Sequence, residues 1–550
     1  MTATAPSEGT AARTDRAVLR VTDLTVAFDG TTAVDGVGFA LAAGETLGLV
    51  GESGSGKSTT ALALLRMLPA GGRITRGSVE LAGQDLAALP EPALRAVRGR
   101  RIAMVFQDPM SSLNPVLTVG KQLDEALRAH GNHPDKRERA SRSLELLDLV
   151  GIPDAAARLR DHPHQFSGGQ RQRIMIALAL ANDAQVLVAD EPTTALDPTV
   201  QQQILRLLTR INRETGTALV VISHDLGVIA RTCRRLLVMR DGRVVESGTT
   251  DEVLTAPQHP YTKQLLAAVP RLETPSPAAA NSTPGAEPLL TVGGLRKTYG
   301  ARRRAVTALD GVDLVLHPGE TLGLVGESGS GKSTLARALV QVHAPSGGEI
   351  LFRGQAFGRG GERAARREVQ LVFQDPYSSL NPRMTAGQIV AEPLIAHGLG
   401  DRAARARRVA ELLEQVGLDP ESAGRHPRAF SGGQRQRIGI ARALAPEPSV
   451  LICDEPVSAL DVSVQAQVLD LLARLQRELG LALLFIAHDL AVVRQVSHRI
   501  AVMHRGRIVE TGPADRVVTA PEHPYTAELL AAVPRLDTRP AALTTTRSTA

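Results

Sequence analysis

The residues best suited to chemistry lie in a stretch of sixteen, GETLGLVGESGSGKST, found at 44–59 and again without change at 319–334. Each copy contains the pattern G-x-x-x-x-G-K-[ST], at 51–58 and 326–333. Glycines let the backbone curl so that several N–H groups converge on phosphate oxygens, and the helix that follows presents its positive N-terminus to them. The alternative is a chance Gly/Ser loop, but this loop follows an apolar strand, precedes a helical pattern and occurs twice. The pattern therefore predicts two phosphate-binding loops.

Individual roles follow for the polar residues of each loop. Lys57 and Lys332 are expected to reach the β- and γ-phosphates of ATP, and Ser58 and Ser333 to ligate Mg²⁺. The ATP-binding residues expected in the loops are Gly51, Glu52, Ser53, Gly54, Ser55, Gly56, Lys57, Ser58 and Thr59 in the first copy, and Gly326, Glu327, Ser328, Gly329, Ser330, Gly331, Lys332, Ser333 and Thr334 in the second.

A pair of carboxylates ends an apolar strand in each half of the chain, Asp190 with Glu191 and Asp454 with Glu455. The Asp of each pair is placed to hold Mg²⁺ through water, and the Glu to polarise the water that attacks the γ-phosphate. A histidine follows the next apolar strand 34 residues after each Asp, where it can sense the γ-phosphate. The alternatives are a solvent-facing acidic pair and a structural histidine. The catalytic candidates are Glu191, His224, Glu455 and His488.

The duplication covers nearly the whole chain. Its further segments include VFQDPMSSLNP (105–115) with VFQDPYSSLNP (372–382), DEPTTALD (190–197) with DEPVSALD (454–461), and HPYTKQLLAAVPRL (259–272) with HPYTAELLAAVPRL (523–536). A repeat near 265 residues has the length of a domain, whereas solenoid repeats run about 20–50 residues. We expect a disordered N-terminus at 1–16, one domain at 17–270, a Pro/Ala/Ser linker at 271–288, a second domain at 289–536 and a disordered tail at 537–550.

Each half has the strand and helix pattern of an α/β fold. The segments at 46–50, 186–190 and 218–223 are short and apolar, as buried strands are, and helical patterns lie between them. Alternating strands and helices predict a mainly parallel sheet. The SSLNP and HPYT segments have the composition of turns and helix starts, and we interpret both first as structural.

Bulk composition limits the possible classes of protein. The formal net charge of +6 is small for 550 residues and does not by itself indicate nucleic-acid binding. Two cysteines, one in each half, support neither a disulfide framework nor a cysteine metal site. The first residues have no apolar signal-peptide core, and no uncharged apolar run reaches the roughly 20 residues that span a bilayer. A soluble or peripheral protein is expected.

The order of motifs resembles the ABC-transporter ATPase family. The segment SGGQ, at 167–170 and 431–434, lies between the phosphate loop and the Asp-Glu pair in each half. The resemblance implies an α/β fold of two tandem P-loop NTPase (ABC ATPase) domains, each a mainly parallel sheet with an inserted helical subdomain, at about 108–165 and 375–429. It also implies further nucleotide contacts. The residues are the Q-loop and metal-contacting Gln107 and Gln374, the D-loop Asp197 and Asp461, the adenine-stacking Phe28 and Tyr299, and the signature residues Ser167, Gly168, Gly169, Gln170, Ser431, Gly432, Gly433 and Gln434.

In that family the SGGQ segment of one domain closes over the ATP bound by the other. The resemblance therefore implies two head-to-tail composite sites, one from Lys57, Glu191 and His224 with 431–434, the other from Lys332, Glu455 and His488 with 167–170. Both halves keep every motif, so two hydrolytically competent sites are expected. Mg²⁺ ligands are expected at Ser58, Gln107, Asp190, Ser333, Gln374 and Asp454. A homodimer of whole chains stays open.

The sequence after each Gln resembles the branch of the family that imports dipeptides, oligopeptides, nickel and glutathione. The alternative is a soluble tandem factor acting on ribosomes or nucleic acid, but the linker here is short and Pro-rich instead of long, charged and helical. The resemblance implies two permease subunits, an indirect extracytoplasmic solute-binding protein, no nucleic acid, and a place on the cytoplasmic face of the cell membrane. The segments after Tyr261 and Tyr525 have no Cys, so the iron–sulfur cluster of some relatives is not expected. The transported solute stays open.

Overall fold

The chain forms two compact units in a computed structural model that describes residues 17–108, 112–131, 133–194, 196–276, 287–300, 305–357, 363–375, 377–458 and 460–533. The first unit runs to Ala268, except for Asp197–Thr199, and the second contains Val269–Val533. The predicted termini, at 1–16 and 537–550, lie outside the described residues, and so do residues 277–286 of the linker predicted at 271–288. Within the described part of the chain, every helix is too short or too polar to traverse a lipid bilayer.

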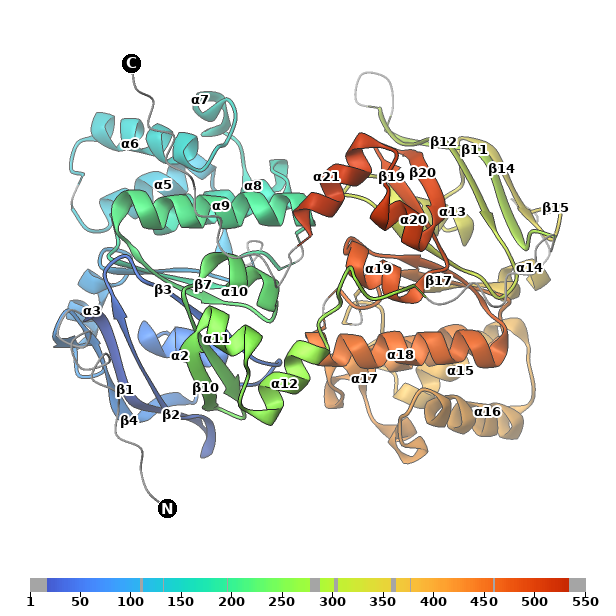
Figure 1. Cartoon of the computed structure of the whole chain (residues 1–550), viewed down its shortest axis with the longest axis horizontal. Helices are drawn as coiled ribbons and strands as arrows, with labels where there is room; N and C mark the ends of the chain where they lie inside the picture. Colours follow the sequence, from blue (N-terminus) through green and yellow to red (C-terminus); the bar gives the residue numbers. More distant parts are fainter. Residues whose placement is uncertain are drawn as a thin grey trace. The chain divides into compact units, whose positions relative to one another are not determined.

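The first unit contains the elements drawn in blue to green in Figure 1. Its strands are β1 (Ala17–Phe28), β2 (Thr31–Ala42), β3 (Thr46–Val50), β4 (Gly72–Leu81), β5 (Gln84–Asp85), β6 (Ile102–Val105), β7 (Val186–Asp190), β8 (Ala218–Ile222), β9 (Arg235–Arg240) and β10 (Arg243–Thr249). Its helices are α2 (Lys57–Leu64), α3 (Glu91–Val97), α5 (Val119–Arg128), α6 (Lys136–Leu149), α7 (Ala155–Arg158), η1 (Pro163–Gln165), α8 (Gly168–Ala179), α9 (Pro198–Thr215), α10 (Leu226–Thr232), α11 (Thr250–Thr255) and α12 (Pro260–Ala267).

The second unit repeats this order of elements. Its strands are β11 (Leu290–Tyr299), β12 (Val306–Leu316), β13 (Thr321–Val325), β14 (Gly347–Phe352), β15 (Gln355–Ala356), β16 (Val369–Val372), β17 (Val450–Asp454), β18 (Ala482–Ile486), β19 (Arg499–His504) and β20 (Arg507–Pro513). Its helices are α13 (Lys332–Leu339), α14 (Arg363–Glu368), α15 (Ala386–His397), α16 (Arg402–Gln415), η3 (Pro420–Gly424), η4 (Pro427–Ala429), α17 (Gly432–Leu444), α18 (Val462–Leu479), α19 (Leu490–Val496), α20 (Ala514–Thr519) and α21 (Pro524–Ala532).

The predicted parallel sheet is present in both units, and the expected fold class is confirmed. In the first unit the strand order is β10-β9-β3-β8-β7-β6, and the second has β16-β17-β18-β13-β19-β20. Strands β3, β7 and β8 are five residues long and buried throughout, as expected for parallel strands covered on both faces. Only the last strand of each sheet, β10 or β20, runs antiparallel to its neighbour. The parallel strands therefore present their carboxyl ends at one edge.

A second, antiparallel sheet in each unit is a feature that the sequence analysis does not anticipate. Its order is β2-β1-β4-β5 in the first unit and β12-β11-β14-β15 in the second. Between the two sheets of the first unit lies one hydrophobic cluster, which includes Leu24 and Leu41 from the antiparallel sheet, Val188 and Val220 from the parallel sheet, and Leu64 from α2. Burying these side chains from both sheets fixes the helix that follows the phosphate loop in the middle of the unit.

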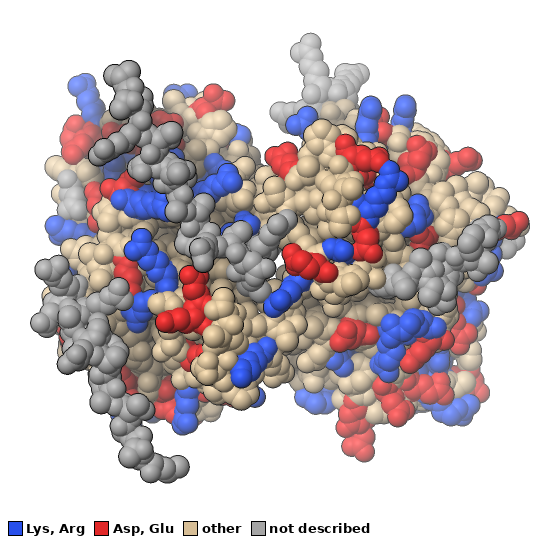
Figure 2. Space-filling model, in the orientation of Figure 1, with Lys and Arg blue, Asp and Glu red and all other residues tan. Residues whose placement is uncertain are grey.

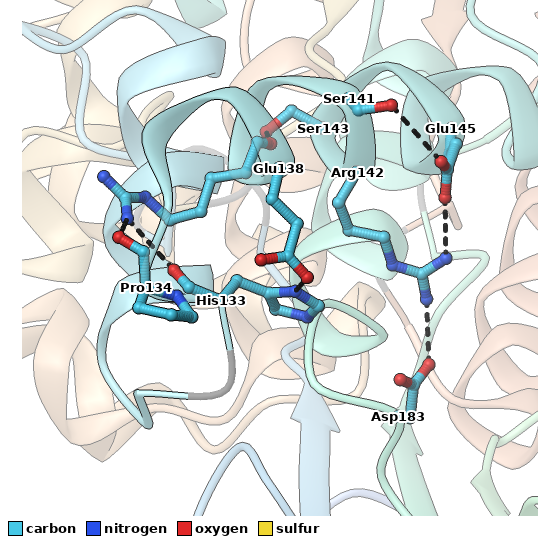
Figure 3. A network of polar contacts seen from close by, with 9 residues as sticks. His133, Pro134, Glu138, Ser141, Arg142, Ser143, Glu145 and Asp183 are labelled. Atoms are coloured by element: carbon cyan, nitrogen blue, oxygen red, sulfur yellow. Dashed lines mark hydrogen bonds and ion pairs between the residues drawn. The ribbon is translucent and has the colours of Figure 1, made fainter.

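The predicted helical subdomain of the first unit consists of α5 to α7, which Figure 1 shows at the end of the unit away from β1 and β2. Polar contacts hold α6 in place, and several are drawn in Figure 3. Arg139 donates to the carbonyl oxygens of His133 and Pro134 at 3.0 and 2.8 Å. Arg142 pairs with Asp183, before β7, at 2.8 Å. The Arg139 contacts fix the start of α6, and the Arg142–Asp183 pair joins the subdomain to the segment that leads into the strand of the acidic pair.

Candidate nucleotide-binding sites

The sequence-predicted residues of each half meet at the carboxyl edge of its parallel sheet. In the first unit, the phosphate loop follows β3, Asp190 is the last residue of β7, and His224 lies two residues beyond β8. Gln107 lies two residues beyond β6, at the end of the same row of strands. Because parallel strands end at the same edge, segments up to 167 residues apart in sequence are brought to one site.

Two glycines of the first loop sit where no side chain fits. Gly51 has φ 154°, and a Cβ there would collide with the carbonyl oxygen of Met239 on β9. Gly56 has φ 96°, forms the N-cap of α2, and would bring a Cβ within 2.8 Å of the Ala33 carbonyl oxygen. Glycine accepts the left-handed backbone of Gly56 without strain. The loop can therefore curl tightly against the sheet and direct its N–H groups toward an anion at the start of α2.

The lysine of the loop is turned inward. Lys57 is 5% exposed, and its Nζ donates to the carbonyl oxygens of Gly51 and Glu52 at 2.8 and 2.7 Å and to Ser55 Oγ at 3.2 Å. Its neighbour Ser58 donates from Oγ to Asp190 Oδ1 at 3.1 Å. A hydroxyl and a carboxylate that meet in this way are hard oxygen donors of the kind that Mg²⁺ prefers.

Glu191 is held in an uncommon backbone conformation that aims its carboxylate into the site. Its φ is 47°, a left-handed value that costs a non-glycine residue about 1–3 kcal/mol. Oε2 accepts hydrogen bonds from Gln107 Nε2 at 2.7 Å and from Thr194 Oγ1 at 2.8 Å, and Oε1 lies 3.3 Å from His224 Nδ1. The structure thus brings Gln107, Glu191 and His224 into one chain of contacts.

The pKa values of the two neighbouring carboxylates of the first site are shifted in opposite directions. Burial raises the pKa of Asp190 to about 6, against the opposing hydrogen bond from Ser58. Burial also acts on Glu191, but the hydrogen bond and charge of His224 outweigh it and lower the pKa of Glu191 to about 2. The same pairing raises the pKa of His224, although burial opposes that shift. Glu191 is therefore ionised at neutral pH and ready to accept a hydrogen bond from a water molecule.

The second site repeats the first almost contact for contact. Lys332 donates to the loop carbonyls of Gly326 and Glu327 at 2.7 and 2.8 Å, and burial lowers the pKa of Lys332. The acidic pair has the same surroundings, with contacts Ser333 Oγ–Asp454 Oδ1 at 3.0 Å, Gln374 Nε2–Glu455 Oε2 at 2.9 Å and His488 Nδ1–Glu455 Oε2 at 3.5 Å. Glu455 also has φ 47°.

The pKa shifts of the second site have the same directions as those of the first. Burial raises the pKa of Asp454. The pKa of Glu455 is lowered because the hydrogen bond and charge of His488 outweigh burial, and the same pairing raises the pKa of His488 against its burial. Both sites therefore keep an ionised Glu beside an imidazole whose pKa is raised, which predicts the same chemistry in each half.

The SGGQ segments begin helices α8 and α17. Ser167 and Ser431 are the N-caps, and each forms a capping box with the Gln three residues later. Ser167 and Gly168 are exposed, so the N-terminus of α8 is open to an anion. Gly169 is buried, and a Cβ there would collide with Val200 of α9. Among the remaining predicted contacts, Asp197 directly precedes α9, Asp461 caps α18 by accepting from Val464 N at 3.0 Å, and Gly432, Gly433 and Gln434 form the first turn of α17.

The two predicted adenine-stacking aromatics differ in their surroundings. Phe28, at the end of β1, is partly buried, and its ring lies against Gly72, where a Cβ would come within 2.5 Å of it. Tyr299, at the end of β11, is 37% exposed, with Lys297 Nζ 5.1 Å from its ring centroid. The ring of Tyr299 is therefore the freer of the two to receive a planar base.

Two kinds of contact in the sites were missed by the sequence analysis. Thr194, three residues after Glu191, donates to its carboxylate. Tyr261 Oη accepts from the backbone N–H of Glu52 at 3.0 Å, and Tyr525 Oη accepts from that of Glu327 at 2.9 Å. The repetition of HPYT at a constant offset was the available signal. Its interpretation as a turn and helix start is confirmed, since Pro260 opens α12, but it has this additional contact with the phosphate loop.

Comparison with known families agrees with this geometry. The ABC transporter profile matches residues 34–194 and 309–458, and the profile of the oligopeptide/dipeptide transporter C-terminal region matches residues 245–308 and 509–550. The first profile covers more than half of the chain and includes both phosphate loops and both acidic pairs. The chain belongs to the ABC transporter ATPase family, binds ATP and is an ATPase.

Relatives narrow the branch of the family. The chain is 49% identical to the glutathione import ATP-binding protein GsiA of Escherichia coli (strain K12), over 94% of this chain and 89% of that protein. It is 48% identical to the GsiA protein of Salmonella typhimurium, over 95% and 90%. An ATP-binding cassette solved as a dimer with ADP and phosphate is 31% identical, covering 41% of this chain and 98% of that one with a TM-score of 0.38. The predicted membership of the peptide-importer branch is confirmed.

Proposed function

We propose that this chain is the ATP-hydrolysing motor of an importer for short peptides, with glutathione as the first solute to test. The observation that carries the proposal is the paired site, in which a phosphate loop, an acidic pair, a Gln and a His meet at one sheet edge in each half. The oligopeptide/dipeptide C-terminal region supports the peptide branch. The names of the relatives support glutathione, and dipeptides, oligopeptides, nickel chelates and antibiotic peptides stay alternatives.

In each site the loop and α2 or α13 would hold the phosphates, and the acidic pair, which has the same geometry in both units, would prepare the water. Lys57 is proposed to leave its loop carbonyls for the β- and γ-phosphate oxygens when ATP binds. Ser58, Asp190 and Gln107 offer the oxygen donors that suit Mg²⁺, which would neutralise charge on the phosphates. Glu191 orients and polarises the attacking water, while His224 holds the Glu191 carboxylate and faces the γ-phosphate.

We further propose that the ATP sites are completed in a head-to-tail manner by the SGGQ segments. The exposed N-terminus of α17 would supply donors to the γ-phosphate held by Lys57, and that of α8 to the γ-phosphate held by Lys332. One chain brings two loops and two SGGQ segments, so a single chain is sufficient for two sites. Differential binding of ATP to the closed arrangement would then drive the switch of the transporter.

The partners required by this role are membrane permeases, because an importer needs a pore. We propose two permease subunits, a solute-binding protein that acts through them, and a peripheral place on the cytoplasmic face of the membrane. The helical subdomains, α5 to α7 and α15 to α16, are the proposed docking surfaces. Figure 2 shows basic and acidic side chains interspersed on the face in view, without a continuous basic track among the described residues, which favours this role over nucleic-acid binding.

The test is an affinity purification from detergent-solubilised membranes. The bait is the tagged chain carrying Glu191→Gln and Glu455→Gln, with ATP and Mg²⁺ present, and the matched control carries Lys57→Ala and Lys332→Ala. We expect two multi-span permeases with the first bait and a weaker recovery with the control, because only the first bait can hold ATP in a closed state. Recovery of ribosomes or DNA without any membrane protein would contradict the proposal.

A further inference from the structure

The HPYT segments build the same local structure in both units. His259 and His523 are the N-caps of α12 and α21, and the Nδ1 atom of each accepts a hydrogen bond from the backbone N–H of the Tyr two residues later, at 3.2 and 3.1 Å. Both tyrosines are buried, with 3% of Tyr261 and 6% of Tyr525 exposed. The imidazole cap therefore fixes the start of each helix and, with it, the direction of the tyrosine side chain.

Each tyrosine reaches a phosphate loop that lies about two hundred residues earlier in its own unit. Tyr261 Oη accepts from Glu52 N at 3.0 Å. The carbonyl group of the same Gly51–Glu52 peptide unit accepts from Lys57 Nζ at 2.8 Å. One peptide unit of the loop is thus held at both ends, by a tyrosine hydroxyl on one side and by the phosphate-binding lysine on the other. A peptide unit held in this way cannot rotate without breaking a buried hydrogen bond.

The second loop is held by the same two contacts. Tyr525 Oη accepts from Glu327 N at 2.9 Å, and Lys332 Nζ donates to the Gly326 carbonyl oxygen at 2.7 Å. Burial raises the pKa of Tyr525 to about 12, so its hydroxyl stays protonated at any physiological pH. The same arrangement is present in both units, so it is a regular feature of the repeat.

The helix that carries each tyrosine is itself tied to the sheet. Glu246 of β10 accepts from the backbone N–H groups of Gln258 and His259 at 2.7 and 3.1 Å. In the second unit Glu510 of β20 accepts from Glu522 and His523 at 2.9 and 3.1 Å. Strand β10 pairs with β9, which pairs with the loop-bearing β3. The chain therefore continues from β10 at the sheet edge into α11 and α12, which lie beside β10 in Figure 1. Tyr261 of α12 then contacts the phosphate loop.

The side chain that covers the tyrosine ring differs between the units. The guanidinium of Arg240 lies 5.0 Å from the ring centroid of Tyr261, whereas the ring of His504 stacks on Tyr525 with centroids 3.9 Å apart. Both neighbours sit at the end of the strand next to the loop strand, β9 or β19. The ring contacts have changed while the hydroxyl contact has been kept, which points to the hydroxyl as the functional group.

We propose that Tyr261 and Tyr525 are positioning residues that brace the phosphate loops in the conformation that receives ATP. By fixing the Gly–Glu peptide unit, each hydroxyl keeps the remaining loop N–H groups aimed at the phosphates before the nucleotide arrives. Preorganisation of this kind raises affinity because less order has to be created on binding. The two equilibria are linked: if docking of α12 and α21 on the loops favours ATP binding, then bound ATP must favour that docking by the same factor.

The first experiment measures nucleotide binding and turnover of the purified full chain. The variant is Tyr261→Phe with Tyr525→Phe, which removes two hydroxyl groups and little else. The matched control is Thr255→Val with Thr519→Val, which removes two hydroxyls that donate to helix carbonyls in α11 and α20 of the same regions. Calorimetry with MgATP and MgADP gives the affinities, steady-state hydrolysis gives KM and kcat, and thermal unfolding without nucleotide reports on the fold.

We expect the Phe variant to bind ATP and ADP about tenfold more weakly, because each loop then loses the partner of a half-buried N–H and is no longer fixed in one conformation. KM rises by a similar factor, kcat changes little, and the control and the nucleotide-free unfolding temperature stay close to wild type. Affinities within twofold of wild type would overturn the proposal, and so would a fall in unfolding temperature with no change in affinity, which is the result of a purely structural role.

A second measurement on the wild-type chain keeps the proposal falsifiable if the variant does not fold. Amide hydrogen exchange is followed with and without MgATP in the peptides that contain α12 and α21. Bound nucleotide is expected to slow exchange in both helices, since docking on the loop and nucleotide binding are linked. Exchange in these helices that is unaffected by nucleotide, while the loop peptides are protected, would overturn the proposal.

Discussion

The nucleotide sites of the two units are nearly identical, whereas their helical subdomains differ. In the sites, the Ser–Asp contact measures 3.1 Å in one unit and 3.0 Å in the other, and the Gln–Glu contact 2.7 and 2.9 Å. The Glu of the acidic pair has φ 47° in both. The same strained Glu and the same Ser and Gln donors are therefore found at the ends of two apolar strands, as one shared chemistry requires.

The helical subdomains do not share this identity. In the first unit, Arg139 of α6 pairs with Asp124 of α5 at 2.6 Å. In the second unit, the position of Asp124 is taken by Ala391, and the equivalent Arg405 donates to the Leu399 carbonyl oxygen at 2.8 Å. Helix α15 also contains Pro393 and leaves Ile395 58% exposed. The first subdomain has an ion pair between its two helices at this place, where the second has an arginine–carbonyl contact, and the second leaves an apolar side chain exposed.

This contrast indicates that the nucleotide sites are constrained by the reaction, whereas the helical subdomains are free to differ with the surface that each one contacts. Hydrolysis of one nucleotide demands one geometry, so the sites cannot diverge far without losing activity. A docking surface has only to match its own partner. If each helical subdomain docks on one permease subunit, as proposed above, the difference between the subdomains predicts two permeases that are unlike each other.

The largest effect is expected from Lys57→Ala and Lys332→Ala. Each change removes a buried cation from the phosphate site, which costs about 2–5 kcal/mol of binding free energy, or at least thirtyfold in ATP affinity at the altered site. Calorimetric titration of each single variant measures the remaining site. The comparison predicts equal stoichiometry and affinity for the two variants. Two different affinities would break the equivalence of the sites.

A somewhat smaller effect is expected from His224→Ala and His488→Ala. Each change removes the partner of the carboxylate proposed to be catalytic, and a group proposed to face the γ-phosphate, so turnover at that site should fall about 100-fold. ATP affinity should change little, because the loop and lysine stay intact. Steady-state hydrolysis separates kcat from KM, and an effect confined to one of the two variants would show that only one site is catalytic.

The helical subdomains provide the contrasting pair, Arg139→Ala and Arg405→Ala. Arg139→Ala removes an ion pair and two carbonyl contacts and should destabilise the first unit by about 2 kcal/mol. Arg405→Ala loses one neutral carbonyl acceptor and should cost about 1 kcal/mol. Chemical denaturation of the nucleotide-free chain measures both. Equal losses would remove the physical basis for calling the first subdomain the more strongly tethered.

The smallest effect is a pH dependence of stability that both sites share. The pKa of His224 and of His488 is raised above the ordinary 6.5 because the paired Glu outweighs burial. Their stabilisation is fully present below pH 6.5 and is lost as the pH rises through the raised folded-state pKa. Ionised Glu191 stabilises the folded state above pH 4.5, its ordinary pKa. This contribution to stability is lost only as the pH falls toward about 2, the pKa of Glu191 in the folded state.

The measurement is the nucleotide-free unfolding temperature between pH 6 and pH 9. Wild type should lose a few degrees more over this range than the His224→Gln, His488→Gln double variant, which has no imidazole to titrate. Identical pH profiles for the two proteins would show that the histidine–glutamate pairs contribute no stability.

The sequence was sufficient for the parallel sheet and for the placement of the loop, acidic pair, Gln and His, because each lies directly after a short apolar strand. Parallel strands end at one edge of the sheet, so residues that directly follow these strands in the sequence lie close together in the fold. The antiparallel sheet was missed because β1 pairs through several bulges with β2 and β4, and its register depends on those distant partners.

Contacts that depend on side-chain direction were also beyond sequence patterns. Thr194 reaches the Glu191 carboxylate, whereas Ser458 at the equivalent place donates to the Glu455 carbonyl oxygen at 3.2 Å. The hydroxyl types alone do not distinguish these two outcomes. The contact between Tyr261 and Glu52 spans 209 residues, and only the fold brings them together.

The central claim, two equivalent catalytic sites in one chain, is tested most directly by the hydrolysis rates of Glu191→Gln, Glu455→Gln and the double variant. Each substitution keeps the size of the side chain and removes the carboxylate that orients water. The account predicts equal losses in the two single variants and a loss of about 100-fold or more, roughly 3 kcal/mol of barrier, in the double variant. A single variant that hydrolyses ATP at the wild-type rate, beside another that has lost nearly all activity, would contradict it.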